Sequence, residues 1–193
     1  MPIHAIQRAA LALVTGAAIA LRSVLGAGQT GAPSVQYRSP EGVEYRSLPD
    51  TDAIKTARAA AAADPKNIAR IIDLGVAESG ARQFREAIAT FTRGLEIEPG
   101  NADRALLLRW RGHRYLSIRE FDRASVDLTR GGALDSTIYG IWYHLGIVQY
   151  VRGDFSAAAA SFVKAQSIAP DAGELAGSTD WLWMSLSRAG RHP

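Results

Sequence analysis

The chain has 193 residues, of which 21% are charged and 47% apolar, and its formal net charge is +3. It has no cysteine, which excludes disulfide scaffolds, thiolate chemistry and a lipid-modified cysteine anchor. Because the chain is rich in alanine and has only 8 prolines, its composition favours helices and argues against an all-β fold.

Residues 1–27 have the pattern of a signal peptide. His4 and Arg8 precede an uncharged run from Ala9 to Leu21, and Ala27 is a candidate cleavage site. The run is shorter than the ~20 residues that a membrane-spanning helix needs. We therefore expect a periplasmic or secreted protein without a stable membrane span. The alternative is an amphipathic N-terminal helix that packs on the body.

Residues 28–49 are rich in Gly, Ser, Pro, Gln and Thr, which is typical of a flexible tether. With a turn at 40–42, Val35 and Tyr37 would face Val43 and Tyr45 in a short hairpin. Since an isolated hairpin is marginal in water, we expect an extended tether unless the segment packs on another element.

From residue 50 onward, one pattern occurs three times, beginning at Gly75, Gly112 and Gly146. The positions that follow each glycine at equal spacing are Phe84, Phe121 and Phe155, then Ala87, Ala124 and Ala158, then Phe91, Leu128 and Phe162. The spacing predicts two helices per copy. A mid-helix glycine costs about 1 kcal/mol relative to alanine, and we expect close contact with the facing alanine to offset that cost.

The third copy carries the clearest family resemblance. Its residues Trp142, Leu145, Gly146, Phe155, Ala158, Phe162, Ala165 and Pro170 resemble the 34-residue pattern of tetratricopeptide repeat (TPR) proteins. The resemblance covers a domain of residues 50–193, with repeats near 68–101, 105–138 and 139–172 and a closing helix at 178–189. It implies an all-α solenoid of three full repeats with flanking half-repeats. We expect helices near 50–63, 67–80, 84–97, 105–117, 121–133, 139–151, 155–168 and 178–189.

In this family, the first helices of successive pairs line a concave groove that holds a peptide or a partner surface. Counting from each glycine and into the closing helix places the following residues on that face: Asp73, Val76, Arg109, Trp110, His113, Tyr143, His144, Ile147, Tyr150 and Trp183. Aromatic residues and arginine are typical of binding hot spots. The alternative is that Trp110, Tyr143 and Trp183 pack against neighbouring helices. The family's lysine–asparagine clamp for a C-terminal carboxylate is not matched.

Other kinds of function have weaker support. Asp73, His113 and His144 share the predicted face and are residue types that bind zinc or iron, but they lie on three helices whose axes are about 9–10 Å apart. No nucleotide, zinc-protease or hydrolase motif occurs. The arginines between 104 and 130 alternate with acidic residues, which indicates a solvated surface rather than a nucleic-acid site.

The sequence thus predicts a non-enzymatic adaptor without cofactor or metal that binds a protein or peptide in the concave groove. A structural subunit of an envelope complex that docks by its convex face is the first alternative. A metal-dependent enzyme is the second.

Overall fold

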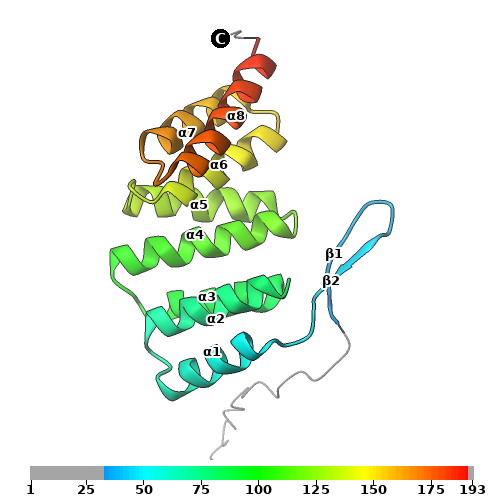
Figure 1. Ribbon diagram of the computed structural model, residues 1–193, viewed down its shortest axis with the longest axis vertical. Helices are drawn as coiled ribbons and strands as arrows, with labels where there is room; N and C mark the ends of the chain where they lie inside the picture. The colour runs from blue at the N-terminus through cyan, green and yellow to red at the C-terminus, as the bar shows by residue number, and fades with distance from the viewer. Residues whose placement is uncertain (1–32, 191–193) are drawn as a thin grey trace, which may run out of the picture.

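The computed structural model describes residues 33–190. In this part of the chain, eight helices follow a short two-stranded hairpin. The strands are β1 (Val35–Arg38) and β2 (Glu44–Arg46), and the helices are α1 (Asp52–Ala63), α2 (Ile68–Gly80), α3 (Phe84–Glu96), α4 (Asn101–Ser117), α5 (Phe121–Leu134), α6 (Tyr139–Val151), α7 (Phe155–Ser167) and α8 (Ala172–Arg188). Figure 1 shows the helices stacked in chain order, with the hairpin projecting from one side near α1.

The predicted all-α fold is confirmed, and two helices begin earlier than predicted. Helix α4 begins at Asn101, directly after Gly100, and α8 begins at Ala172. The Asp171 side chain accepts a hydrogen bond from the Glu174 amide at 2.9 Å and so caps α8. The predicted starts were near residues 105 and 178, whereas the helices begin where the chain leaves the preceding turn.

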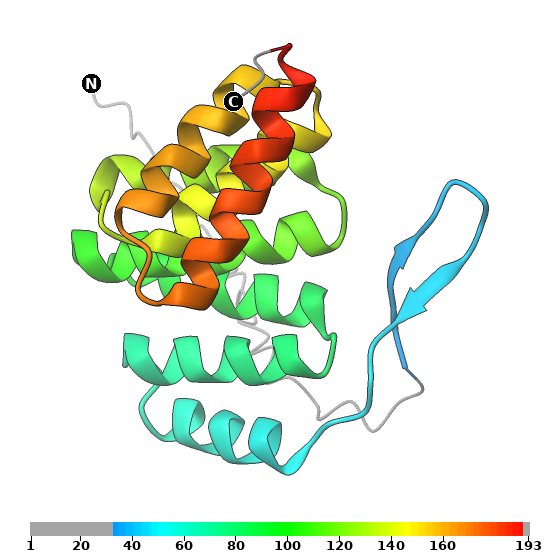
Figure 2. The ribbon, with the colours of Figure 1, turned by 45° about the horizontal axis from the view of Figure 1, so that its top comes forward.

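Helices pack in pairs and also in series. Helices α2 and α3, α4 and α5, and α6 and α7 form antiparallel pairs, while α1 packs on α2 and α8 on α7. The first helix of each pair also contacts the next first helix, so that α2, α4, α6 and α8 form one continuous row. Figure 2 shows the same stack tilted, with α8 crossing the front of the α6–α7 pair. We call the surface of this row the inner-helix face.

The space at each repeat glycine is filled by a different residue from the one predicted. A Cβ on Gly146 would lie 2.7 Å from the Phe162 ring, and a Cβ on Gly112 would lie 2.8 Å from Leu128. The facing alanines such as Ala158 are fully buried but do not supply the closest atoms. The large side chain of the second helix therefore requires the glycine, because it reaches further across the pair than an alanine methyl does.

A polar contact recurs at equivalent positions in the first and third repeats. Thr90 donates its hydroxyl to Glu78 at 2.8 Å, and Ser161 donates to Gln149 at 2.7 Å. Each bond joins the two helices of its pair. Glu78 is only 5% exposed, and burial raises its pKa from 4.5 to about 7.

The second repeat replaces this contact with a charged one. Asp127 stands at the position of Thr90 and Ser161, and Arg111 donates to both of its carboxylate oxygens, at 2.7 and 2.9 Å. Arg111 also donates to Thr92 on α3 at 3.0 Å. This side chain thus ties α4 to α5 and to the preceding repeat.

In the part of 28–49 that the structure describes, the chain forms the short hairpin that the sequence allowed as the alternative to an extended tether. Tyr37 pairs with Tyr45 and Arg38 with Glu44 in an antiparallel ladder that has an irregularity after Val35. The tether composition is misleading because the hairpin finds a packing partner. That partner is the beginning of α3.

Gln36 is the anchor of the hairpin. It is 1% exposed, accepts a hydrogen bond from the Arg85 amide at 2.7 Å and donates to Glu86 at 2.9 Å. At the other end, the Leu48 amide donates to the Ala81 carbonyl at 2.8 Å. The base of the hairpin is therefore fixed to the turn between α2 and α3, while its tip extends beyond the helices (Figures 1 and 2).

The predicted signal peptide, residues 1–27, lies outside the described residues. Among the helices that are described, none combines the length and apolarity needed to cross a membrane.

Candidate functional site

The predicted groove residues differ widely in their exposure. Asp73, Val76 and Trp183 are exposed, with Trp183 at 60%; Arg109, Trp110, His113, Tyr143, Ile147 and Tyr150 are half-buried; His144 is buried. All lie on the row of first helices, as the repeat register implies. The inner-helix face is thus partly exposed surface and partly the contact between first helices of successive repeats. We call this contact the seam.

Arg109 and Trp110 belong mainly to this seam. The Trp110 ring stacks on Phe91 with centroids 6.4 Å apart, and the Arg109 guanidinium lies 3.7 Å from the Trp110 ring centre. A Cβ on Gly140 would lie 2.5 Å from Arg109 Nε, so the absence of a side chain at Gly140 makes room for the arginine between α4 and α6.

The charge of Arg109 is incompletely compensated within the described residues. Its Nη1 is buried and has no hydrogen-bond partner there. Burial lowers the pKa of Arg109 to about 10, and Glu174 opposes that shift. A buried N–H without an acceptor costs about 1–3 kcal/mol, so the enclosure of Arg109 between α4 and α6 is a local cost to stability.

His113 and His144 form a stacked pair across the α4–α6 seam. Their ring centroids are 3.8 Å apart, and His144 Nδ1 donates to the Gly140 carbonyl. His113 Nδ1 is buried without a partner among the described residues. Burial, the facing histidine and the nearby arginines hold the pKa of His113 far below its usual range, and burial likewise lowers that of His144.

Arg114, which the sequence did not single out, is a further buried cation of α4. It is 8% exposed, its guanidinium lies 5.3 Å from the Phe84 ring centre, and its Nε has no partner among the described residues. Burial and then the charge of Arg109 lower its pKa to about 10. No sequence signal marks Arg114, because its burial depends on how α4 packs on α3.

The two tyrosines stabilise the third repeat. Tyr143 meets Phe162 and His144 edge to face, and Tyr150 meets Phe155 and Trp181 in the same way. Trp110 and Tyr143 therefore pack against neighbouring helices, as the alternative prediction stated. Trp183 does not, because it is 60% exposed.

The structure does not gather the proposed metal ligands. Among the described residues, no cluster of three or more His, Asp or Glu side chains has the geometry to hold a metal ion. Asp73 is exposed on α2, whereas the histidine pair is enclosed between α4 and α6.

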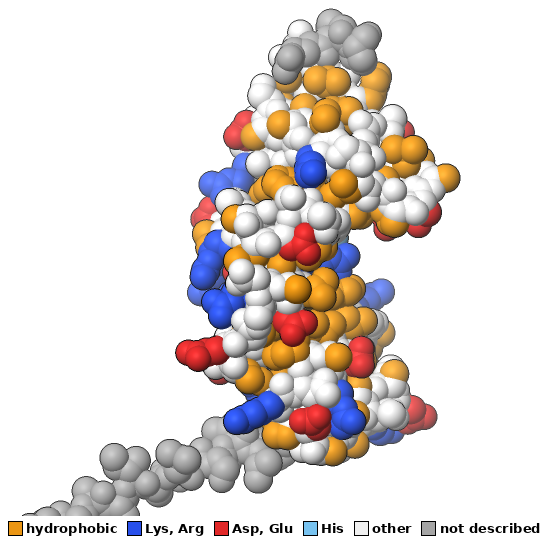
Figure 3. Space-filling view, turned by 90° about the vertical axis from the view of Figure 1, so that its left-hand side faces the viewer, with side chains coloured by type: hydrophobic (Ala, Val, Ile, Leu, Met, Phe, Trp, Pro, Cys, Tyr) orange, Lys and Arg blue, Asp and Glu red, His pale blue; other side chains and the backbone are white. Residues whose placement is uncertain are grey.

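The side of the array that carries the loops between repeats has a mixed surface. Figure 3 shows hydrophobic side chains in a column across the stacked helices, with acidic and basic side chains interleaved around them. Charges of both signs are consistent with a surface suited to protein contacts rather than to a phosphate backbone.

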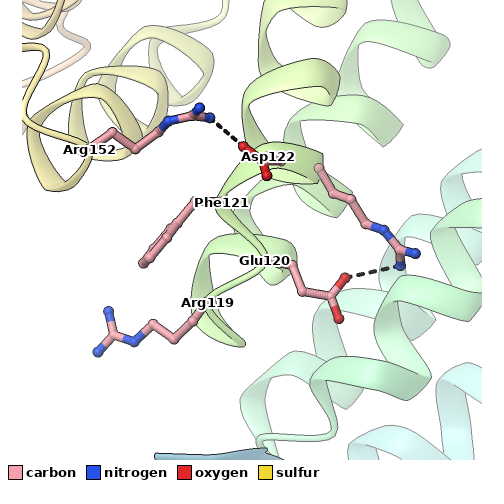
Figure 4. Close-up of a pocket in the computed structure, with 6 residues that line it drawn as sticks. Arg119, Glu120, Phe121, Asp122 and Arg152 are labelled. Carbon is pink, nitrogen blue, oxygen red and sulfur yellow. Dashed lines mark hydrogen bonds and ion pairs between the residues drawn. The ribbon is translucent and has the colours of Figure 1, made fainter. Parts of the chain in front are cut away.

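Two cavities lie on the opposite side, which carries the turns within each repeat. The first has a volume of about 680 Å³ and lies between the hairpin and the turns at Arg82 and Arg119. The second, about 450 Å³, lies around Arg119, Phe121 and Arg152 (Figure 4). Neither cavity is marked by a sequence pattern: the first forms where the hairpin packs on the array, and the second forms between the turns of successive repeats.

No protein-family model matches the chain, and no curated protein matches it. Solved structures do. A crystal structure of MamA protein superposes with a TM-score of 0.60 at 22% sequence identity, covering 72% of this chain and 73% of that chain. The first TPR of Spaghetti (RPAP3), bound to the HSP90 peptide SRMEEVD, superposes with a TM-score of 0.58 at 17% sequence identity. This match covers 66% of this chain and 96% of that chain. A crystal structure of the APC/C hetero-tetramer Cut9-Hcn1 superposes with a TM-score of 0.61 at 18% sequence identity, covering 68% of this chain and 26% of that chain.

At these identities the likeness establishes the fold. The threefold sequence pattern, the pairing of α2–α3, α4–α5 and α6–α7 and the contacts along the row of first helices agree with it. The chain therefore has the tetratricopeptide repeat fold.

Proposed function

We propose that the chain is a non-enzymatic adaptor that binds a protein or peptide partner on the inner-helix face. The observation that carries the proposal is the set of exposed apolar side chains on this face, Val76, Leu106 and Trp183, which lie on three helices of the row and which a partner surface would cover.

The exposed fractions of these side chains are large for apolar residues. Val76 is 37% exposed on α2, Leu106 is 37% exposed one turn before Arg109, and Trp183 is 60% exposed on α8. Such residues are the anchors that partner surfaces commonly cover. That the RPAP3 TPR domain is bound to a peptide supports a peptide partner here.

The test is capture of partners from the native envelope fraction by wild type and two double variants. Val76→Glu/Trp183→Glu places charges on the inner-helix face. Val126→Glu/Val163→Glu does the same on the second helices α5 and α7, where these valines are 56% and 53% exposed. We expect only the first variant to lose the partner. Loss with the second alone would replace our proposal with the structural subunit that docks by its convex face.

Arg109 and Tyr143 are poor choices for this test. Both are half-buried in the seam, so Arg109→Glu or Tyr143→Ala would lower stability as well as change the face. Val76 and Trp183 avoid this ambiguity because much of each side chain lies in solvent.

Export is a separate part of the proposal. It rests on the pattern of residues 1–27. Intact-mass measurement of protein made in its own host should give a mature chain that begins near Gly28. A chain that retains Met1 would remove the assignment to the periplasm or the extracellular medium.

A further inference from the structure

The larger cavity combines an aromatic wall with two cationic turns. Tyr37 and Tyr45 lie 5.8 Å apart on the hairpin. Across from them are Arg82 and Phe84, at the turn between α2 and α3, and Arg119, at the turn between α4 and α5. With about 680 Å³, the cavity is within the range of pockets that hold ligands.

The smaller cavity continues along the same edge. Arg119 lines both cavities, and Phe121 and Arg152 line the second. Figure 4 shows the Phe121 ring between Arg152 and Arg119, with the Arg119 side chain directed away from the two acidic residues of its own turn. Two cavities that share one residue form an elongated site, which suits an extended chain better than a compact molecule.

The charges of the other cations that line these cavities are already compensated. Arg152 pairs with Asp122 at 2.7 Å, Arg123 with Glu120 at 3.0 Å, and Arg46 with Glu44. Within residues 33–190, the guanidinium groups of Arg82 and Arg119 have neither an ion pair nor a side-chain hydrogen bond. They are the cations available to a ligand.

The backbone at these two arginines shows that the fold alone would favour another residue. Arg82 has φ 56° and Arg119 has φ 64°, in the left-handed region. The equivalent turn of the third repeat has Gly153, at φ 84°. A left-handed conformation costs a non-glycine residue roughly 1 kcal/mol, so glycine would suit all three turns. At two of them the chain has a guanidinium instead, and both line the larger cavity.

We propose that this edge is a second binding site, which takes an extended acidic peptide segment of a partner protein. Carboxylates of the peptide pair with Arg82 and Arg119, and its apolar side chains pack on Tyr37, Tyr45 and Phe121. Glu41 and Glu44 also line the first cavity and Asp122 the second. A peptide can place uncharged residues opposite these carboxylates, whereas a polynucleotide has a negative charge at every nucleotide and fits less well. The site is separate from the inner-helix face.

The left-handed turns allow a sharp test. Arg82→Gly/Arg119→Gly removes both guanidinium groups while relieving the backbone, so the variant should be as stable as wild type or more so. Glu98→Gly is the matched backbone control, since Glu98 has φ 57° in the loop between α3 and α4, outside both cavities. Lys66→Gln/Arg93→Gln is the matched charge control, because it removes two exposed cations elsewhere.

The probe is a fluorescent dodecapeptide with three Glu-Ala-Glu-Phe repeats, titrated by anisotropy at two salt concentrations. We expect the arginine-to-glycine variant to bind at least tenfold more weakly, and both controls and Val76→Glu/Trp183→Glu to bind within twofold of wild type. The peptide with Gln in place of Glu should bind as weakly as the arginine-to-glycine variant binds the original.

Four results would overturn the proposal. The first three are no saturable binding by wild type, equal weakening by the charge control, and tighter binding of a 12-nucleotide single-stranded RNA that depends on the same arginines. Loss of binding in Val76→Glu/Trp183→Glu alone would assign the peptide to the inner-helix face and leave the edge without a ligand.

Discussion

The Phe162 ring occupies the volume that a side chain on Gly146 would need, with a hypothetical Cβ 2.7 Å from its nearest atom. Gly146 lies inside α6, where alanine is intrinsically better by about 1 kcal/mol. Close packing of α6 on α7 therefore outweighs helix propensity at this position.

Gly146→Ala should destabilise the protein by about 1–3 kcal/mol, because the fully buried Phe162 ring has nowhere to move. The control is Gly80→Ala, at a helical glycine with nothing within 4 Å of the added Cβ. Urea unfolding of the two variants compares them directly. Equal stability of both variants would mean that the α6–α7 pair can separate without cost.

Glu78 should make the protein less stable as pH rises. Its pKa is about 7 in the folded state, because of burial, against 4.5 unfolded. Below pH 4.5 the carboxyl group is neutral in both states. Between pH 4.5 and 7 it loses its proton only in the unfolded state. The free energy of unfolding therefore falls by an amount on the order of 3 kcal/mol by pH 8. Glu78→Gln keeps an acceptor for Thr90 and should remove this loss in denaturant melts at pH 4.5 and 8.

The histidine pair should have the opposite pH dependence. Both folded-state pKa values are lowered by burial, so stability is complete above about 6.5 and falls as the pH drops and the unfolded imidazoles take up protons. The slope is about 1.4 kcal/mol per pH unit for each imidazole. In a Glu78→Gln background, His113→Phe should reduce the slope between pH 6.5 and 4.5. An unchanged slope would show that His113 is protonated in the folded protein.

Asp127→Ala should cost about 3–5 kcal/mol, because it leaves Arg111 largely buried without its carboxylate. Thr92 alone accepts one hydrogen bond from the guanidinium. The double variant Arg111→Leu/Asp127→Leu should lose less stability than Asp127→Ala, since it removes both charges. Thermal unfolding of the two variants distinguishes a mere loss of attraction from an uncompensated buried charge.

Gln36→Ala should release the hairpin from α3. The substitution removes the hydrogen bonds from the Arg85 amide and to Glu86. Amides of residues 35–46 should then exchange with solvent much faster, while those of α6 and α7 should keep their protection, because repeats contact only their neighbours. Ser39→Ala, at the exposed tip, is the control and should leave exchange at the base unchanged.

The sequence by itself determined the repeat architecture. The recurring glycine, alanine and large apolar residues specify helix positions and pairwise packing, which depend on contacts at short sequence separation. All eight helices within residues 33–190 could be predicted for this reason. Only the starts of α4 and α8, which Gly100 and the Asp171 cap define, differ by several residues from the prediction.

Only the tertiary structure decided which residues of the inner-helix face are surface and which are seam. Arg109 is enclosed because Gly140, on a different repeat, leaves room for it, and His113 is enclosed because His144 stacks on it. The larger edge cavity likewise requires Gln36 to bond to residues about fifty positions later in the chain. Burial of this kind arises from the register between elements far apart in sequence, which no local periodicity encodes.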